Sequence, residues 1–400
     1  MRRRIFFEAL GTGTLATFYG EKPAKRPTAI PAEKQRGGRM EPWIEVDLAA
    51  VAWNFSRLKR HVKVPGRAVV KANAYGHGLI EVSKSLEKAG ADWLMIGKLD
   101  EAVALREANV RCPILNFGPF SSGDSAEIVE RNISQSVYAE NADSLQRAAS
   151  KLGKKASVHI DIDTGMRRTG ISHVRALPLI EKIASWSGVK IDGISTTLTE
   201  DVEFDKEQIR HFTELCSAAK KRGIALGLRH ASSSAGILAS SDYNLDMVRP
   251  GITLYGYYPN AQTQKEDALE LKPVLKLKAR VIFIDELKPG DSLSYHRAFK
   301  SAKRMRAATI GIGYSDGYPP ELGGKGFVRI GNKKFPMLKA VTANHSMADL
   351  GDDRDVQVGD EAVLIDSAPG SGLTADVLAA QCGLSDYRIL IGISPLLPRN

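Results

Sequence analysis

Lys71 is the first residue whose surroundings point to chemistry. Residues 69–78 read VVKANAYGHG, so the lysine ends a short apolar run and a glycine-containing turn follows it. A lysine partly shielded from water at the end of a strand has the lowered pKa that an amine needs for Schiff-base chemistry. An ordinary surface lysine at a strand end is the alternative that this stretch alone leaves open.

Other stretches concentrate arginine, histidine, serine and tyrosine. They read HIDIDTGMRRTG at 159–170, RHASSSA at 229–235, VRPGITLYG at 248–256, SYHR at 294–297 and GYSDGY at 313–318. The three cysteines, Cys112, Cys216 and Cys382, lie far apart and show no CxxC or Cys/His spacing. We therefore expect neither a disulfide framework nor a metal site, and we expect buried free thiols, although one pair could bridge.

Short apolar runs alternate with amphipathic stretches from Trp43 onward, a pattern typical of parallel strands joined by crossover helices. The expected strands are Ala68–Lys71, Trp93–Gly97, Ile114–Phe117, Ser134–Tyr138, Val158–Ile162, Gly193–Thr197, Leu228–Ser232 and Met247–Leu254. The expected helices include Leu48–Val62, Leu79–Ala89, Asp100–Ala108 and Asp205–Arg222, with Asp47 and Asn141 as N-caps. Eight such units predict a (β/α)8 TIM barrel over residues 40–272, and Lys71 would end one of its strands, where active sites of this fold lie.

A second, mostly β domain is predicted for residues 273–400. Helical periodicity fades there, and strand-like runs alternate with Pro-Gly, Gly-Gly and Gly-Asn turns. The runs are Leu275–Ile284, Ala307–Ile312, Gly326–Ile330 and Glu361–Ile365, with one helix over Thr374–Gln381. The predicted fold class is therefore α/β, a TIM barrel followed by a mostly β C-terminal domain.

The charge of the chain, +10 over 400 residues, is concentrated at its start. Residues 1–39 hold nine Lys or Arg against three Glu, so the body is only mildly basic and nucleic acid is not expected as a partner. The opening RRRIFF and the apolar run after it resemble a twin-arginine signal, which predicts export to the periplasm; a frayed basic tail on a cytoplasmic protein is the alternative. The rest of 1–39 is predicted to be a linker, and no stretch is apolar enough to span a membrane.

With these motifs in this order and spacing, residues 42–398 resemble the alanine racemases. The resemblance implies a pyridoxal 5'-phosphate cofactor, joined as an aldimine to Lys71 within the N-terminal barrel. Inverting a stereocentre requires one group to take a proton from one face and a second group to return it on the other. The resemblance implies Lys71 and Tyr295 for these roles, with Tyr295 reaching the barrel of a second subunit in a head-to-tail homodimer. A tyrosine that merely packs on the β domain is the alternative for Tyr295.

The resemblance also implies how cofactor and substrate are held. Arg249 would face the pyridine nitrogen, and because arginine stays protonated it can donate there without letting the ring take a proton. Arg168 would bind the substrate carboxylate and the catalytic phenol, Ala343 would border that carboxylate, and Tyr314 would line the entrance. The implied cofactor-binding set is Lys71, Tyr75, His230, Ser234, Arg249, Gly251, Ile252 and Tyr387.

Four places near this site depart from the family pattern. Asp161 stands where most members have a lysine, often carbamylated; since Asp161 and Asp163 share one strand face, we hypothesise that Asp161 orients Arg168. The other departures are Thr197 for histidine, Ser233 for asparagine, and Ala343-Asn344 for a Met-Asp pair. The lost thioether bulk at that pair predicts a roomier substrate pocket and a wider substrate range.

The predicted function is amino-acid racemisation with alanine as the expected substrate, an isomerase activity that would supply D-alanine for peptidoglycan. A racemase of broader specificity and a pyridoxal-phosphate-binding paralogue without activity are the alternatives. A decarboxylase or eliminase on a related barrel is disfavoured by Tyr295 and Arg249, because decarboxylases of that architecture prefer a carboxylate at the pyridine nitrogen.

Overall fold

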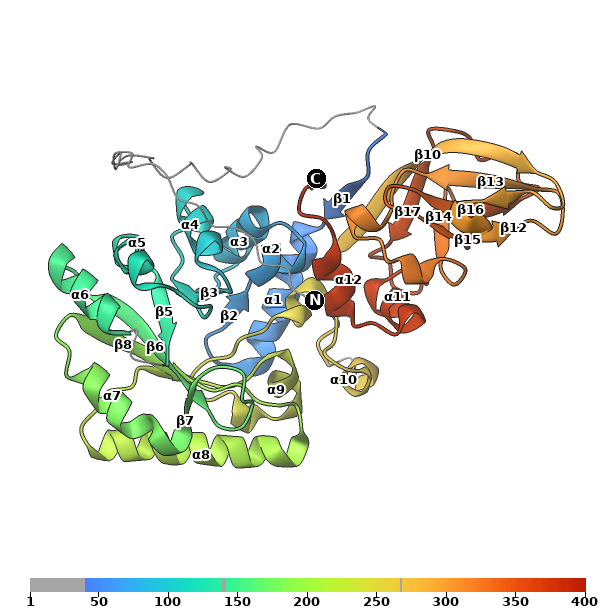
Figure 1. The fold of residues 1–400 in the computed structure, drawn as a ribbon. Helices are drawn as coiled ribbons and strands as arrows, with labels where there is room; N and C mark the ends of the chain where they lie inside the picture. Colours follow the sequence, from blue (N-terminus) through green and yellow to red (C-terminus); the bar gives the residue numbers. More distant parts are fainter. Residues whose placement is uncertain (1–39, 139–141, 267) are drawn as a thin grey trace, which may run out of the picture. The chain divides into compact units, whose positions relative to one another are not determined.

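The computed structural model describes residues 40–400, apart from 139–141 and 267. The predicted leader and linker at 1–39 and the predicted N-cap Asn141 lie outside the described residues. The described residues belong to one compact unit. They form two main sheets, one parallel and one antiparallel (Figure 1).

The parallel sheet has the strand order β2-β3-β4-β5-β6-β8-β9, with β7 paired to β6. Its strands are β2 (Arg67–Val69), β3 (Trp93–Ile96), β4 (Ile114–Asn116), β5 (Ser134–Val137), β6 (Ala156–Asp163), β7 (Ile171–Ser172), β8 (Val189–Ser195) and β9 (Leu228–His230). Strands β4 and β5 are buried throughout, as expected for a parallel sheet covered on both faces. Seven of the eight predicted barrel strands are thereby confirmed.

The predicted eighth strand, Met247–Leu254, is wrong. Met247 and Val248 make only isolated bridges, to His230 and Gly66, and a 3-10 turn, η4 (Ile252–Tyr255), follows. Pro250 has no N–H to donate, which prevents a continuous ladder here. The segment still closes the barrel, because the Val69 N–H donates to the Pro250 carbonyl at 3.0 Å and the neighbouring residues bond to the segments on either side.

Helices follow the barrel strands and cover the outside of the sheet (Figure 1). They are α1 (Leu48–Val62), α2 (Lys71–Tyr75), α3 (Leu79–Lys88), α4 (Leu99–Glu107), α5 (Ser125–Glu130), α6 (Ala142–Leu152), α7 (Ala176–Ala184), α8 (Val202–Lys221), α9 (Ser234–Ala239) and α10 (Ala261–Glu266). The predicted cap of α1 is confirmed, since the Asp47 carboxylate accepts from the Ala50 N–H at 2.9 Å. Helix α1, which has the predicted bounds, buries Val51, Phe55 and Leu58 against the core.

The antiparallel sheet has the order β1-β10-β13-β16-β15-β14-β17, and a further pairing of β10 with β17 closes it. Its strands are β1 (Trp43–Val46), β10 (Leu275–Leu287), β13 (Met305–Ile310), β14 (Phe327–Ile330), β15 (Lys333–Val341), β16 (Ser346–Gly351) and β17 (Glu361–Ile365). A small ribbon pairs β11 (Ser292–Leu293) with β12 (Phe299–Lys300), and the helices α11 (Ala375–Cys382) and α12 (Asp386–Gly392) follow. Although the sequence assigned residues 40–272 to the barrel, β1 lies in this second sheet, paired with β10.

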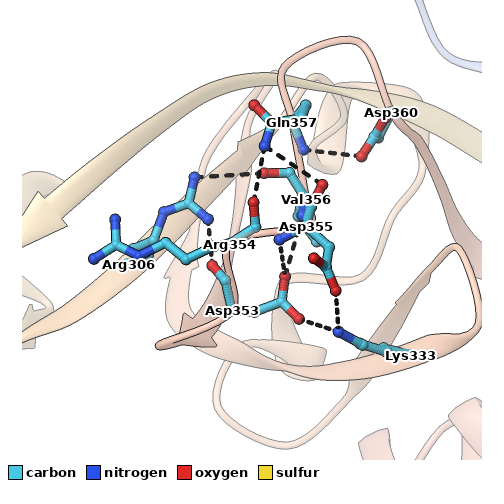
Figure 2. Close-up of polar contacts among 8 residues, drawn as sticks. All are labelled: Arg306, Lys333, Asp353, Arg354, Asp355, Val356, Gln357 and Asp360. Atoms are coloured by element: carbon cyan, nitrogen blue, oxygen red, sulfur yellow. Dashed lines mark hydrogen bonds and ion pairs between the residues drawn. The ribbon is translucent and has the colours of Figure 1, made fainter.

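A polar cluster closes the loop between β16 and β17 (Figure 2). Lys333 donates to the carboxylates of Asp353 and Asp355 at 2.5 and 2.7 Å. Asp353 also accepts from the backbone amides of Asp355 and Val356, and Arg306 donates to its carbonyl. The contacts therefore fix the shape of the loop, while the solvent-exposed ion pair itself contributes little stability.

No helix among residues 40–400, gaps excepted, combines the length and apolar character needed to cross a membrane. Within the same residues, no group of three or more His, Cys, Asp or Glu side chains is arranged to hold a metal ion.

Candidate active site

One cavity gathers most of the predicted site residues at the carboxyl ends of the barrel strands. Its empty space, including the open mouth, is about 750 Å³. The lining residues are Val69, Lys71, Tyr75, Met95, Leu115, Phe117, Ser136, Asp161, Arg168, Thr169, Ser195, Thr197, Ser233, Ser234, Arg249, Gly251 and Tyr387.

Lys71 follows β2 and opens the short segment α2, so its side chain reaches the cavity from the barrel rim. Its Nζ lies 5.4 Å from the centre of the Phe117 ring. Burial lowers the pKa of Lys71 below its usual range, the charge of Arg168 lowers it further, and Glu101 partly opposes the shift. The amine is therefore more readily deprotonated than a surface lysine and better able to attack a carbonyl.

The backbone after Lys71 makes a left-handed turn of four consecutive non-glycine residues. The φ angles of Ala72, Asn73, Ala74 and Tyr75 lie between 52° and 56°. Each such residue costs roughly 1–2 kcal/mol, so neighbouring groups must hold the turn in place. The sequence analysis did not predict this turn, and it delivers the side chain of Tyr75 to the cavity.

Tyr75, Ser234, Gly251 and Tyr387 form a cradle of donors on one side of the cavity. The Ser234 hydroxyl accepts from the Gly251 N–H at 3.0 Å, which fixes the backbone after Pro250 beside α9. A Cβ added to Gly251 would lie 2.5 Å from the hydroxyl of Tyr75, so only glycine allows this approach. The Tyr75 ring in turn packs on Tyr387, with ring centres 5.8 Å apart.

The cradle fits an anion such as a phosphate. Burial raises the pKa values of Tyr75 and Tyr387 well above the usual value for a phenol, so both hydroxyls keep their protons at neutral pH and can donate. Gly251 and Ser234 line the cavity beside both tyrosines, and the Tyr75 hydroxyl lies close to Gly251. With the amine of Lys71 on the same cavity wall, the donor set suits pyridoxal 5'-phosphate, which carries both an aldehyde and a phosphate.

Arg249 is buried and is held by three acceptors. Its guanidinium donates to the carbonyls of Thr196 and Ala231 at 2.7 and 2.6 Å, and to Nδ1 of His230 at 3.0 Å. Burial lowers the pKa of Arg249 to about 10, while Asp161 partly opposes this, so the group stays charged at neutral pH. Its Nε–H makes no hydrogen bond with any other described residue, which leaves a donor available on the cavity wall.

His230, predicted to bind the cofactor, lies behind Arg249 and does not line the cavity. Because Arg249 can only donate, Nδ1 of His230 accepts, and its Nε2 therefore donates to His159 at 3.2 Å. His230 thus acts through Arg249. Ile252 is fully buried and likewise does not line the cavity, so its predicted role stays a prediction.

Asp161 and Asp163 hold the loop that carries Arg168. Asp161 accepts from the hydroxyls of Thr169 and Ser195 at 3.2 and 3.1 Å, and Asp163 accepts from the backbone amides of Gly165 and Arg167. Burial raises the pKa of Asp161, and the charges of Arg249 and Arg168 oppose that shift. Asp161 therefore contacts the loop through Thr169, the residue after Arg168, and not through a hydrogen bond to Arg168 itself.

Tyr295, Tyr314 and Ala343 lie on the β domain and do not line this cavity. The side chain of Tyr295 is 78% exposed and that of Tyr314 is 54% exposed. The loops of Tyr314 and Ala343 are joined, since the Ser315 N–H donates to the Ala343 carbonyl at 2.9 Å and Asn344 donates to the Ser315 hydroxyl. Of the departures from the family pattern, Asp161, Thr197 and Ser233 line the cavity.

The sequence analysis missed several lining residues. They include Met95, Leu115, Phe117, Ser136, Thr169 and Ser195. Phe117 lies just beyond the end of β4 and Ser195 lies at the end of β8, so the rule that active sites lie at the carboxyl ends of barrel strands could have found them.

The fold and the cavity define a class of protein, a TIM-barrel enzyme with a C-terminal β domain and a lysine and anion cradle at the barrel rim. Family models agree: "Alanine racemase, N-terminal domain" matches residues 46–259, and "Alanine racemase, C-terminal domain" matches residues 274–400. The chain therefore belongs to the alanine racemase family, whose members are pyridoxal-phosphate-dependent isomerases.

Individual relatives support the same assignment. An alanine racemase of Halothermothrix orenii is 36% identical over 367 residues, covering 90% of this chain and 96% of that protein. An alanine racemase structure from Clostridium difficile 630 has a TM-score of 0.86 at 30% identity, covering 91% of this chain and 96% of that one. A Bartonella henselae alanine racemase with covalently bound pyridoxal phosphate has a TM-score of 0.79 at 26% identity, covering 90% and 99%. These likenesses support the interconversion of L- and D-alanine as the activity of this chain.

Proposed function

We propose that the protein interconverts L- and D-alanine with pyridoxal 5'-phosphate held at Lys71, using Lys71 and Tyr295 as proton-transfer groups on opposite faces of the substrate. The observation that carries this is the cavity itself. It combines an amine of lowered pKa, a neutral donor cradle and two arginines on one barrel rim.

In this proposal the cofactor, when bound, withdraws electrons from the substrate's Cα and makes its proton removable. Tyr75, Ser234 and Tyr387 would hold its phosphate, while Gly251, whose N–H donates to Ser234, would let the phosphate approach the backbone closely. The free Nε–H of Arg249 would donate to the pyridine nitrogen. Because an arginine does not give up its proton, this contact limits the electron withdrawal, which favours reprotonation of Cα over side reactions.

The substrate carboxylate would pair with Arg168, which lies on the cavity wall near Lys71. This pairing would fix the orientation of Cα between the two proton-transfer groups. Lys71, whose pKa is lowered by burial, would hold or release a proton on one face at neutral pH.

Tyr295 would supply the opposite face from a second copy of the chain in a head-to-tail dimer. Two observations support this arrangement. Tyr295 is exposed on its own β domain, and two large apolar residues are exposed after the barrel strands: Val174, in the 3-10 turn after β7, is 75% exposed, and Val202, the first residue of α8, is 65% exposed. A β domain from a second copy would cover these side chains and complete the cavity.

The direct test is to incubate the purified protein with single L-amino acids and to follow the D-isomer with a stereospecific oxidase. We expect D-alanine to form fastest, and Lys71→Ala to form none. If the wild-type protein racemises no amino acid, the proposed function is wrong. A paralogue without activity would still bind the cofactor, so the absorption spectrum of the bound cofactor is recorded alongside.

For the segment 1–39 we propose a role in export, on the basis of its sequence alone. The run of arginines before an apolar stretch supports a twin-arginine signal. Fractionation of cells that express the full chain, beside a variant with Arg2 and Arg3 replaced by lysine, would test it. Equal distribution of the two proteins would contradict this role.

A further inference from the structure

The segment that follows Lys71 is held from two sides by the charged side chains of Glu101 and Arg399, and Arg399 has no part in the chemistry above. We call residues 71–78 the lysine turn. On one side, the Glu101 carboxylate accepts from the Asn73 N–H at 3.0 Å. On the other side, Nε of Arg399 donates to the Gly76 carbonyl at 2.9 Å. This second contact joins the lysine turn to a segment 323 positions away along the chain.

Arg399 has an unusual environment for an arginine. Its terminal nitrogens donate to the carbonyls of Leu397 at 2.7 Å, Pro395 at 3.1 Å and Ser394 at 3.2 Å. Among the described residues no carboxylate pairs with it, and burial lowers its pKa to about 10. The guanidinium is a rigid planar fork, so fixing its terminal nitrogens also fixes the direction in which Nε donates.

The segment that carries Arg399 is itself anchored. The Pro398 carbonyl accepts from the Ile44 N–H at 2.9 Å, and the Asn400 N–H donates to the Ile44 carbonyl at 2.9 Å, which ties this segment to β1. Arg399 therefore links the lysine turn to the antiparallel sheet. The hydrogen bonds of its side chain and of its backbone segment leave Arg399 little freedom to move.

The lysine turn is also packed closely where these contacts are made. A Cβ added to Gly76 would lie 2.2 Å from the Leu390 carbonyl oxygen in α12. A Cβ added to Gly78 would lie 3.0 Å from Cδ of Arg399. The left-handed backbone at residues 72–75, just before Gly76, is unfavourable for these non-glycine residues, so it needs such external contacts to persist.

We propose that Arg399 is a positioning residue for the phosphate of the cofactor: by holding the Gly76 carbonyl it keeps the lysine turn in the form that delivers Tyr75 to the anion cradle. Tyr75 directly precedes Gly76, so a shift of this carbonyl moves the Tyr75 backbone with it. The inference rests on the proposed cofactor. It predicts that loss of Arg399 weakens binding of pyridoxal 5'-phosphate far more than binding of phosphate-free pyridoxal, because Tyr75 would contact only the phosphate.

The test compares Arg399→Ala with wild type and with Arg388→Ala, an exposed arginine of α12 whose side chain makes no recorded contact. Each full-length protein is freed of cofactor with hydroxylamine and titrated with pyridoxal 5'-phosphate and, separately, with pyridoxal, by absorbance. We expect Arg399→Ala to bind pyridoxal 5'-phosphate about tenfold more weakly, the loss of one hydrogen bond from a charged donor, and to bind pyridoxal unchanged. The Arg388→Ala protein should match wild type with both compounds.

An equal loss for both compounds would overturn the inference, because it would show a general structural role for Arg399. Unchanged affinity for both would overturn it as well. If Arg399→Ala does not fold, Arg399→Lys keeps the charge but lacks the fork, and the same preferential loss is expected. Failure of the wild-type protein to bind either compound would instead refute the proposed cofactor, so the two failures are distinguishable.

Discussion

Replacing Gly251 by alanine tests whether the anion cradle depends on close approach of backbone and side chain. The new Cβ would lie 2.5 Å from the Tyr75 hydroxyl and 3.3 Å from the ring carbon that bears it, both inside normal contact distance. The φ of Gly251 is −118°, so alanine brings no left-handed strain, but its ψ of −92° lies outside the main α and β regions and adds a backbone cost to the clash. Tyr75 cannot swing aside freely, because its ring stacks on Tyr255 with centres 4.8 Å apart.

Overpacking of this kind costs about 1–3 kcal/mol, so we expect Gly251→Ala to lower the melting temperature of the cofactor-free protein by a few degrees. The hydroxyl of Tyr75 must move away from the cradle, so pyridoxal 5'-phosphate should bind about tenfold more weakly. Calorimetry and an absorbance titration measure the two effects. Gly392→Ala is the matched control, since its Cβ would meet no atom within 4 Å.

The double variant Gly251→Ala/Tyr75→Phe separates the clash from other causes. Removing the hydroxyl leaves a ring carbon at 3.3 Å as the nearest atom, a contact that a small shift can relieve. We therefore expect the double variant to melt at a higher temperature than Gly251→Ala alone, although it still lacks a phosphate donor. A double variant that melts lower than either single variant would refute this reasoning.

Three further variants test the roles of Asp161, Asp386 and Tyr295. Asp161→Asn removes the negative charge beside Arg168 but keeps a polar group for Thr169, so KM for alanine should rise about tenfold; unchanged kinetics would dispose of the role of Asp161. Burial raises the pKa of Asp386 to about 6, so the ionisation of this carboxyl lowers stability as pH rises from about 4 to about 6, and the loss stays constant above that. Asp386→Asn should therefore melt above wild type at pH 8 and lose that advantage near pH 4, and an advantage independent of pH would contradict the assignment. Tyr295→Phe should still exchange the α-proton of one alanine enantiomer with deuterated water while inversion slows at least ~100-fold, and an unchanged rate of inversion would contradict its role.

The sequence predicted the elements with a strong local signal. Helix α1 begins and ends where its apolar period and the Asp47 cap indicate, and β17 matches the predicted run at Glu361–Ile365. These elements follow from periodicity and capping, which act over a few residues. Other elements depend on distant partners. Strand β1 is too short for its sequence to indicate which sheet it joins. Only its pairing with β10 assigns it to the β domain.

The residues of the site also divide into those that a local sequence signal indicates and those whose position depends on distant contacts. Lys71 was recognisable at the end of a strand, and it does line the cavity. The left-handed turn after it was not, because Ala72, Ala74 and Tyr75 do not favour such a backbone. Contacts from Glu101 to Asn73 and from Arg399 to Gly76 support the turn. The role of His230 could not be read from the sequence either, since its position behind Arg249 depends on how three barrel segments pack.

Subunit complementation tests most directly whether Lys71 and Tyr295 act on one substrate from different copies of the chain. Lys71→Ala and Tyr295→Phe are each expected to be inactive or nearly so. When the two proteins are unfolded, mixed in equal amounts and refolded, half of the dimers should be mixed, and each mixed dimer has one intact site of two. The account predicts recovery of about a quarter of the wild-type racemase activity. A mixture no more active than the two variants alone would contradict a shared site.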